Sequence, residues 1–196
     1  INIIKKSENT NNDIEIMETI QVENTENPIY GIFDPQENNF TLEMWSNTKG
    51  EEIRSVFKRI DKIKLSKSAE DIFVNTIMTY AYLPKKMSDE DFLDLKINWL
   101  MKNNKTDLLE KFLNKNNNFK GKKKIIQYLV DKNIAKADLK EGCDKSDFIS
   151  KEIRDPYLEK FKIYCMIFKD KKNEAQLVFD ILKEQGLSDK FFDSKI

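Results

Sequence analysis

The 196-residue sequence contains no histidine, and this limits the chemistry that the chain can perform. Serine–histidine and cysteine–histidine nucleophilic sites, histidine-bearing zinc sites and imidazole acid–base catalysis all need that side chain. The two cysteines, Cys143 and Cys165, form no Cys-x-x-Cys motif, and the sequence does not supply the set of four ligands that a zinc site needs. The sequence therefore predicts no catalytic residue, no metal site and no cofactor.

Carboxylates are numerous, but none lies in an apolar run with a second one near it. A general acid–base pair with perturbed pKa values needs that arrangement. The acidic groups Glu51-Glu52 and Asp89-Glu90-Asp91 lie at the N-termini of predicted helices, where the helix dipole accounts for them. The five glycines are scattered singly, so no phosphate-binding loop is predicted. An enzyme that uses carboxylates or lysine is kept as an alternative.

Spacing alone leaves two interpretations of the cysteines open. Cys143 and Cys165 each lie at the inner edge of a predicted helix, about one repeat apart, so their side chains could meet. A disulfide there would contribute roughly 3 kcal/mol and indicate an oxidising compartment. The other interpretation is two small, buried hydrophobic side chains.

The overall charge argues against a nucleic-acid or membrane partner. Lys+Arg and Asp+Glu both number 34, so the formal net charge is zero. The only basic cluster, residues 115–124, is interpreted as a loop between repeats rather than a nucleic-acid site. No run approaches 18 apolar residues, so no transmembrane helix is predicted.

Residues 155–186 have the pattern of a helical hairpin. Asp155 is a suitable N-cap, Pro156 suits the first helical position, and Gly186 suits a left-handed helix end. A polar turn at residues 169–173 separates two apolar stripes. The first consists of Tyr157, Phe161, Tyr164, Cys165 and Phe168, and the second of Ala175, Val178, Phe179 and Leu182.

Earlier segments show the same periodicity. Thr48-x-x-Glu51 has the form of a capping box before one helix, Ser68-x-x-Asp71 opens a second that ends at Pro84, and Ser88-x-x-Asp91 opens a third. Further apolar stripes follow to residue 153. The sequence predicts an all-α fold: an irregular tetratricopeptide-like stack of helical hairpins, or α-solenoid, with an extended N-terminal segment.

Three regions are expected along the chain. Residues 1–27 are predicted to be a flexible acidic arm, although residues 14–22 alternate weakly and could pair as a strand or dock in a groove. Residues 28–47 are predicted to be an apolar segment that caps the stack, with an exposed partner-binding patch as the alternative. Residues 48–196 form the predicted helical-repeat domain.

Apolar and aromatic side chains are the candidate partner-binding residues, because grooves of helical repeats often present such anchors to peptides. They are Phe40, Met44, Trp45 and Trp99. Trp99 lies on a helix that is apolar on two sides, so a core position is the competing interpretation.

Several motifs resemble an uncharacterised alphaproteobacterial family of exported, tetratricopeptide-like helical proteins. The motifs are Gly31-x-Phe33-x-Pro35, Met44-Trp45-x-x-Thr48, Ser68 with Ala81-x-x-Pro84, Asp155-Pro156-Tyr157-x-x-Lys160, Cys165, and Glu184-Gln185-Gly186 followed by Phe191-Phe192. The resemblance spans about residues 30–192. It implies export to the periplasm, which favours the disulfide between Cys143 and Cys165, and it implies that this chain is one section of a longer product. A cytoplasmic location is the alternative.

The resulting hypothesis is a non-enzymatic protein–protein interaction scaffold of the cell envelope, with a protein or peptide partner. A structural subunit that is permanently buried in a larger envelope assembly is the first alternative. The carboxylate or lysine enzyme is the second.

Overall fold

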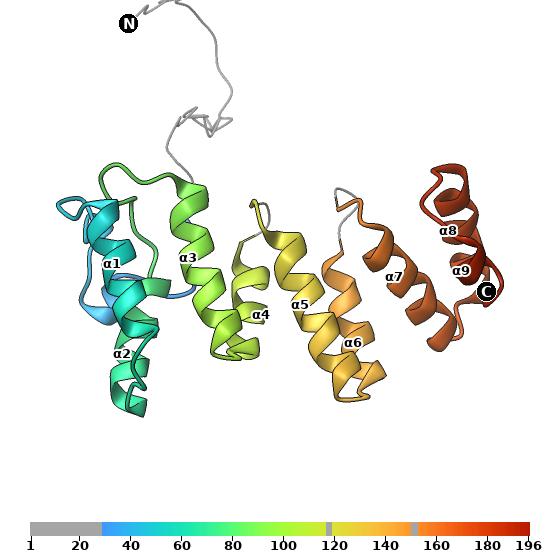
Figure 1. The fold of residues 1–196 in the computed structure, drawn as a ribbon, viewed down its shortest axis with the longest axis horizontal. Helices are drawn as coiled ribbons and strands as arrows, with labels where there is room; N and C mark the ends of the chain where they lie inside the picture. Colours follow the sequence, from blue (N-terminus) through green and yellow to red (C-terminus); the bar gives the residue numbers. More distant parts are fainter. Residues whose placement is uncertain (1–28, 117–118, 150–152) are drawn as a thin grey trace, which may run out of the picture.

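The structure, a computed structural model, describes residues 29–116, 119–149 and 153–196. In these residues, helices stand side by side in a row, with α1 and α2 at one end and α8 and α9 at the other (Figure 1). The helices are α1 (Gly50–Ile60), α2 (Lys67–Met78), α3 (Asp89–Lys102), α4 (Thr106–Lys115), α5 (Lys122–Ala135), α6 (Leu139–Lys145), α7 (Pro156–Phe168), α8 (Lys172–Glu184) and α9 (Lys190–Asp193), with short 3-10 turns η1 (Gln36–Asn38) and η2 (Ser146–Phe148). The predicted all-α stack of helical hairpins is confirmed.

Three of the predicted helix signals are confirmed by hydrogen bonds and backbone angles. The Ser88 hydroxyl accepts a hydrogen bond from the Asp91 amide at 3.1 Å and caps α3. The Asp155 carboxylate accepts from the Tyr157 and Leu158 amides, with Pro156 opening α7. Gly186 follows α8 with a φ of +67°, a left-handed conformation that glycine adopts without steric cost.

Three boundary predictions are wrong. Helix α1 is capped one residue later than predicted, because the Glu52 carboxylate, not that of Glu51, accepts from the amide of the N-cap residue, Lys49, at 2.8 Å. Helix α2 starts after Ser66 rather than Ser68, since the Ser66 hydroxyl accepts from the Ala69 amide.

The second helix also ends at Met78, well before Pro84. The chain after it runs extended, and its backbone pairs with the N-terminal segment. The Tyr80 amide donates to the Phe33 carbonyl, and the Tyr82 amide donates to the Leu42 carbonyl. These long-range hydrogen bonds replace the helical ones.

Residues 30–33 form a strap that lies across the stack and is fixed by hydrogen bonds to its backbone. The Asn116 side chain donates to the Gly31 carbonyl at 2.9 Å and accepts from the Gly31 amide at 3.4 Å. The Lys115 ammonium donates to the Ile32 carbonyl at 2.8 Å, and the Ile32 amide donates to the Met78 carbonyl. This part of the predicted capping segment therefore packs against α2 and α4.

Gly31 sits where a side chain does not fit. A Cβ at this position would lie 2.7 Å from the Tyr80 nitrogen and 2.9 Å from the Met78 carbonyl oxygen, both backbone atoms. We expect Gly31→Ala to lower the free energy of unfolding by about 1 kcal/mol, because the strap must move away from α2. Urea titration measures this.

Gly142→Ala is the matched control, because Gly142 lies within α6 and its Cβ would lie 3.4 Å from the side chains of Asn133 and Phe161, an ordinary contact distance. It should be neutral or stabilising. Equal effects of the two substitutions would contradict the described fit of the strap.

Helix α7 packs on two sides, which changes the predicted apolar stripe. Leu158 and Cys165 are buried in the main core, which extends from Ile32 to Cys165 along the stack. Ile163 points to a second, smaller core that α8 completes with Ala175, Phe179 and Leu182. The second predicted stripe is therefore confirmed, whereas the first is confirmed only in part.

Two predicted features lie fully or partly outside the described residues. The acidic arm, residues 1–27 with the alternating segment 14–22, is outside them, and the basic cluster at 115–124 is described except for residues 117 and 118.

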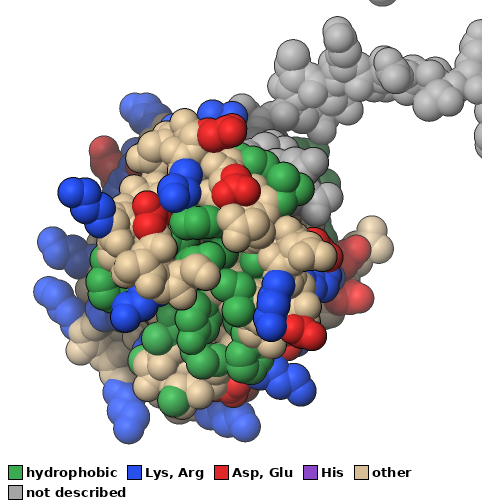
Figure 2. Space-filling model, turned by 90° about the vertical axis from the view of Figure 1, so that its right-hand side faces the viewer, with side chains coloured by type: hydrophobic (Ala, Val, Ile, Leu, Met, Phe, Trp, Pro, Cys, Tyr) green, Lys and Arg blue, Asp and Glu red, His purple; other side chains and the backbone are tan. Residues whose placement is uncertain are grey.

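At the end of the stack where α8 and α9 lie, hydrophobic side chains gather across the middle of the surface, with charged side chains around them (Figure 2).

Candidate functional site

An exposed aromatic ridge runs along α7. Tyr157, Tyr164 and Phe168 are separated by seven and four residues, so they lie on one side of the helix. Tyr164 and Phe168 are 50% and 55% exposed, although the sequence pattern placed all three in a buried seam. Phe161, near this side of the helix, is buried in the main core with the end of its ring next to Gly142 of α6. The ridge is thus supported by the core but faces solvent.

A hydrogen bond fixes the start of this ridge. The Tyr157 hydroxyl donates to the Asp131 carboxylate of α5 at 2.5 Å. Burial and this hydrogen bond, together with the negative charges of Asp131 and Asp155, raise the pKa of Tyr157 to about 12. The phenol therefore stays protonated at neutral pH and continues to donate to α5.

The two cysteines hold the middle of the ridge in place. The sulfur atoms of Cys143 in α6 and Cys165 in α7 lie 2.12 Å apart, at disulfide distance, and both residues are buried. Cys165 directly follows Tyr164. This link, the Tyr157–Asp131 hydrogen bond and the buried Phe161 make the ridge a rigid platform, and rigid aromatic side chains are favourable contact residues because they lose little entropy on binding.

A second apolar surface is a groove of about 330 Å³ between α1 and α2. We call it the α1–α2 groove; its lining residues include Trp45, Val56, Phe57, Ile72 and Phe73. Ile72 is 68% exposed. The Trp45 ring packs edge-on against Phe92, and its indole nitrogen is buried without a hydrogen-bond partner among the described residues.

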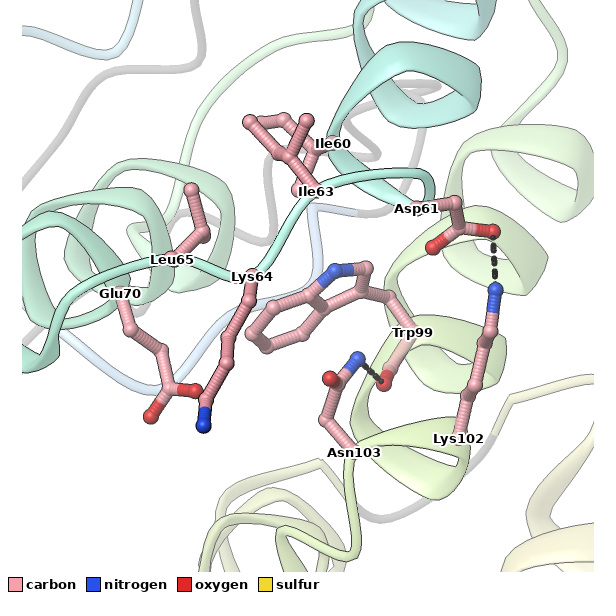
Figure 3. A pocket seen from close by; sticks show the side chains of 9 residues that line it. All are labelled: Ile60, Asp61, Ile63, Lys64, Leu65, Glu70, Trp99, Lys102 and Asn103. Carbon is pink, nitrogen blue, oxygen red and sulfur yellow. Dashed lines mark hydrogen bonds and ion pairs between the residues drawn. The ribbon is translucent and has the colours of Figure 1, made fainter.

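The other predicted anchors occupy different positions. Trp99 is buried and packs against Phe73 with ring centroids 4.9 Å apart. Its indole forms one wall of a more polar pocket of about 260 Å³, where Asp61 and Lys102 form an ion pair at 2.9 Å (Figure 3). Phe40 and Met44 are partly buried and are not among the groove-lining residues. The structure therefore does not bring the four predicted residues into one site.

Lys96 is an unexpected buried charge beneath the strap. Its side chain is only 2% exposed, and its ammonium nitrogen donates to the Tyr30 carbonyl at 3.2 Å and lies 4.2 Å from the centre of the Phe92 ring. Burial lowers the pKa of Lys96 to about 7. The adjoining cavity is only about 10 Å³ in volume, so it has no room for a substrate. We assign Lys96 a role in holding the strap.

Two searches of the described residues complete the description of the site. Among residues 29–116, 119–149 and 153–196, no three His, Cys, Asp or Glu side chains are grouped as metal ligands would be. Within the same ranges, none of the helices combines the length and the apolar character needed to cross a membrane.

Comparison of the sequence and the structure with protein-family models, curated proteins and solved structures gave no match.

Proposed function

We propose that this protein is a tetratricopeptide-like, non-enzymatic scaffold of the cell envelope that binds a protein partner along the aromatic ridge of α7. The observation that carries the proposal is the exposure of Tyr164 and Phe168 on a helix that is otherwise anchored on both sides. Aromatic side chains supply much of the energy at protein interfaces, whereas an exposed aromatic row gives no benefit to an isolated fold.

The charged side chains next to the ridge are paired within the protein, which favours a partner with an apolar surface. Lys160 lies within the same stretch of α7, and its ammonium pairs with Asp189. Lys169 follows the ridge and pairs with Asp144 at 3.2 Å. With these charges paired, the proposed affinity comes from apolar contact, and charge sets the orientation.

A periplasmic location belongs to the same proposal. It is supported by Cys143 and Cys165, whose sulfurs lie at disulfide distance, since disulfides persist in oxidising compartments.

The test is capture by the purified, oxidised protein from an envelope extract, compared with a ridge variant, Tyr164→Glu/Phe168→Glu. Both side chains are half exposed, so we expect the variant to fold and to lose at least about 90% of the captured partner, because a charge in an apolar contact is strongly unfavourable. Phe191→Glu is the matched control, since Phe191 is a more exposed aromatic residue on α9. Mass spectrometry of the bound fraction measures the difference.

A partner retained equally by the wild type and the ridge variant would contradict the proposal. So would the absence of any partner together with turnover of a small molecule from the extract.

A further inference from the structure

We infer that copies of this chain associate head to tail, with the outer face of α8 in one copy bound in the α1–α2 groove of the next. This goes beyond the proposed function, because it concerns the two ends of the stack and not the ridge on α7. The inference rests on two apolar surfaces at opposite ends of one row of helices (Figure 1).

The tail surface lies on the side of α8 that faces away from α7. Ala175, Phe179 and Leu182 are buried against α7. Leu177 and Ile181 are 63% and 43% exposed and lie one turn apart, about 200° around the helix axis from the buried side. A helix that is apolar on two opposite sides is typical of the interior of a helical stack, where a neighbour covers each side.

An acidic side chain borders this pair at the C-terminal end of α8. Glu184 follows Ile181 by three residues on the same side of the helix and is exposed. Glu174, near the start of α8, instead lies beside a pocket that Cys165 and Met166 of α7 also line. The tail therefore consists of an apolar pair with a glutamate at its C-terminal end.

The head surface is the α1–α2 groove, and it also faces away from the rest of the stack. Arg54 pairs with Asp91 of α3 at 2.9 Å, which fixes the side of α1 that meets α3. Val56 follows by two residues and so lies about 200° around α1, on the opposite side. Ile72 lines the same groove from α2.

Charge at one end of the groove is opposite to that of the tail. The connection that joins its two walls is basic, and exposed cations occupy this region at Arg59, Lys62 and Lys67, whereas Lys64 lines the pocket beside Trp99. At the other end, Glu52 is engaged with the Lys49 amide. When α8 lies with its C-terminal end toward this connection, Glu184 reaches the basic end of the groove.

Charge also disfavours a symmetric alternative. If α8 paired with α8 of a second copy around Leu177 and Ile181, Glu184 would not meet the basic end of the groove. A heterologous contact between head and tail places Glu184 near those cations, and it continues into chains or closed rings.

The test is sedimentation velocity of the oxidised protein over a range of concentrations, with one variant for each end. Ile72→Glu disables the head, and Leu177→Glu/Ile181→Glu disables the tail. All three residues are exposed, so circular dichroism should show intact folds. We expect the wild type to form oligomers and each variant alone to remain monomeric, with an apparent dissociation constant at least about 100-fold higher.

A mixture distinguishes head-to-tail association from a symmetric contact. The tail variant retains its groove, and the head variant retains its α8 surface, so an equimolar mixture should form a one-to-one dimer and nothing larger. Phe191→Glu, on α9, is the control at the same end and should associate as the wild type does. High salt should weaken association of the wild type.

Three results would overturn the inference: a monomeric wild type at several hundred micromolar, association that persists in either variant, or a mixture that stays monomeric. None of these substitutions alters Tyr164 or Phe168, so capture of a partner by the ridge is tested independently.

Discussion

Loss of the link between Cys143 and Cys165 should lower the free energy of unfolding by about 3 kcal/mol, because the link closes a loop across 22 residues of sequence in the unfolded chain and so reduces its entropy. In the structure it joins α6 to α7 beside the ridge. Guanidinium titration of the wild type with and without reductant measures the effect. We expect a lower midpoint for the reduced protein and slow reduction under native conditions, because both sulfurs are buried.

Two controls separate the covalent link from the packing of the cysteine side chains. The free energy of unfolding of Cys143→Ala/Cys165→Ala should equal that of the reduced wild type, apart from the cost of the small cavities that the substitutions leave. Reductant should not change the unfolding midpoint of this variant. Thiol titration in denaturant should find no free thiol in the unreduced wild type. Two free thiols there, or an equal midpoint with and without reductant, would contradict the pairing.

A second large effect is expected in the pH dependence of stability. Burial lowers the pKa of Lys96 to about 7 in the folded protein, against 10.5 for an exposed lysine. Between these values the unfolded chain binds more protons than the folded one, so stability should rise with pH across this window. From pH 6 to pH 9 we expect a gain on the order of 3 kcal/mol in the free energy of unfolding from this residue. Urea titrations at intervals of one pH unit measure it.

Lys96→Met identifies the residue responsible. Methionine keeps the approximate length of the side chain without an ionisable group, so the rise between pH 6 and pH 9 should flatten. Lys115→Met is the matched control, because it removes the neighbouring strap contact to the Ile32 carbonyl and leaves Lys96 in place. The control should keep the pH-dependent rise. A rise of equal size in Lys96→Met would assign it to another group.

The sequence predicted the features of this fold that depend on local chemistry. Asp155 and Pro156 define the start of α7 because the N-cap hydrogen bonds and the fixed φ of proline act within one turn. The stripe of Ala175, Phe179 and Leu182 was predictable because a single apolar side of a helix has only one way to be buried.

Features that depend on distant parts of the chain were not predictable in the same way. Tyr164 and Phe168 follow helical spacing and so looked buried, yet Leu158 and Ile163 occupy the core positions of α7. Periodicity shows that a helix has apolar sides, but it does not show which of them a neighbour covers.

The burial of Lys96 is another such case. A lysine in the middle of α3 gives no sign in the sequence that Tyr30, 66 residues earlier, lies over it. The same limit applies to the candidate site, because Phe40 and Met44 are close to Trp45 in sequence but do not line its groove. For the ridge, the residue types and their shared side of the helix were predictable from the sequence, but their exposure was not.

Site-specific photo-crosslinking in cells tests the proposed scaffold role most directly. A photoreactive phenylalanine analogue at Tyr164 lies on the ridge, and the same analogue at Lys140, an exposed position on α6, serves as the control. The proposal predicts that the analogue at Tyr164 forms a discrete adduct with a protein whose mass differs from that of this chain. It predicts no adduct at Lys140. Absence of an adduct at Tyr164, or the same adducts at both positions, would contradict a binding role for the ridge on α7.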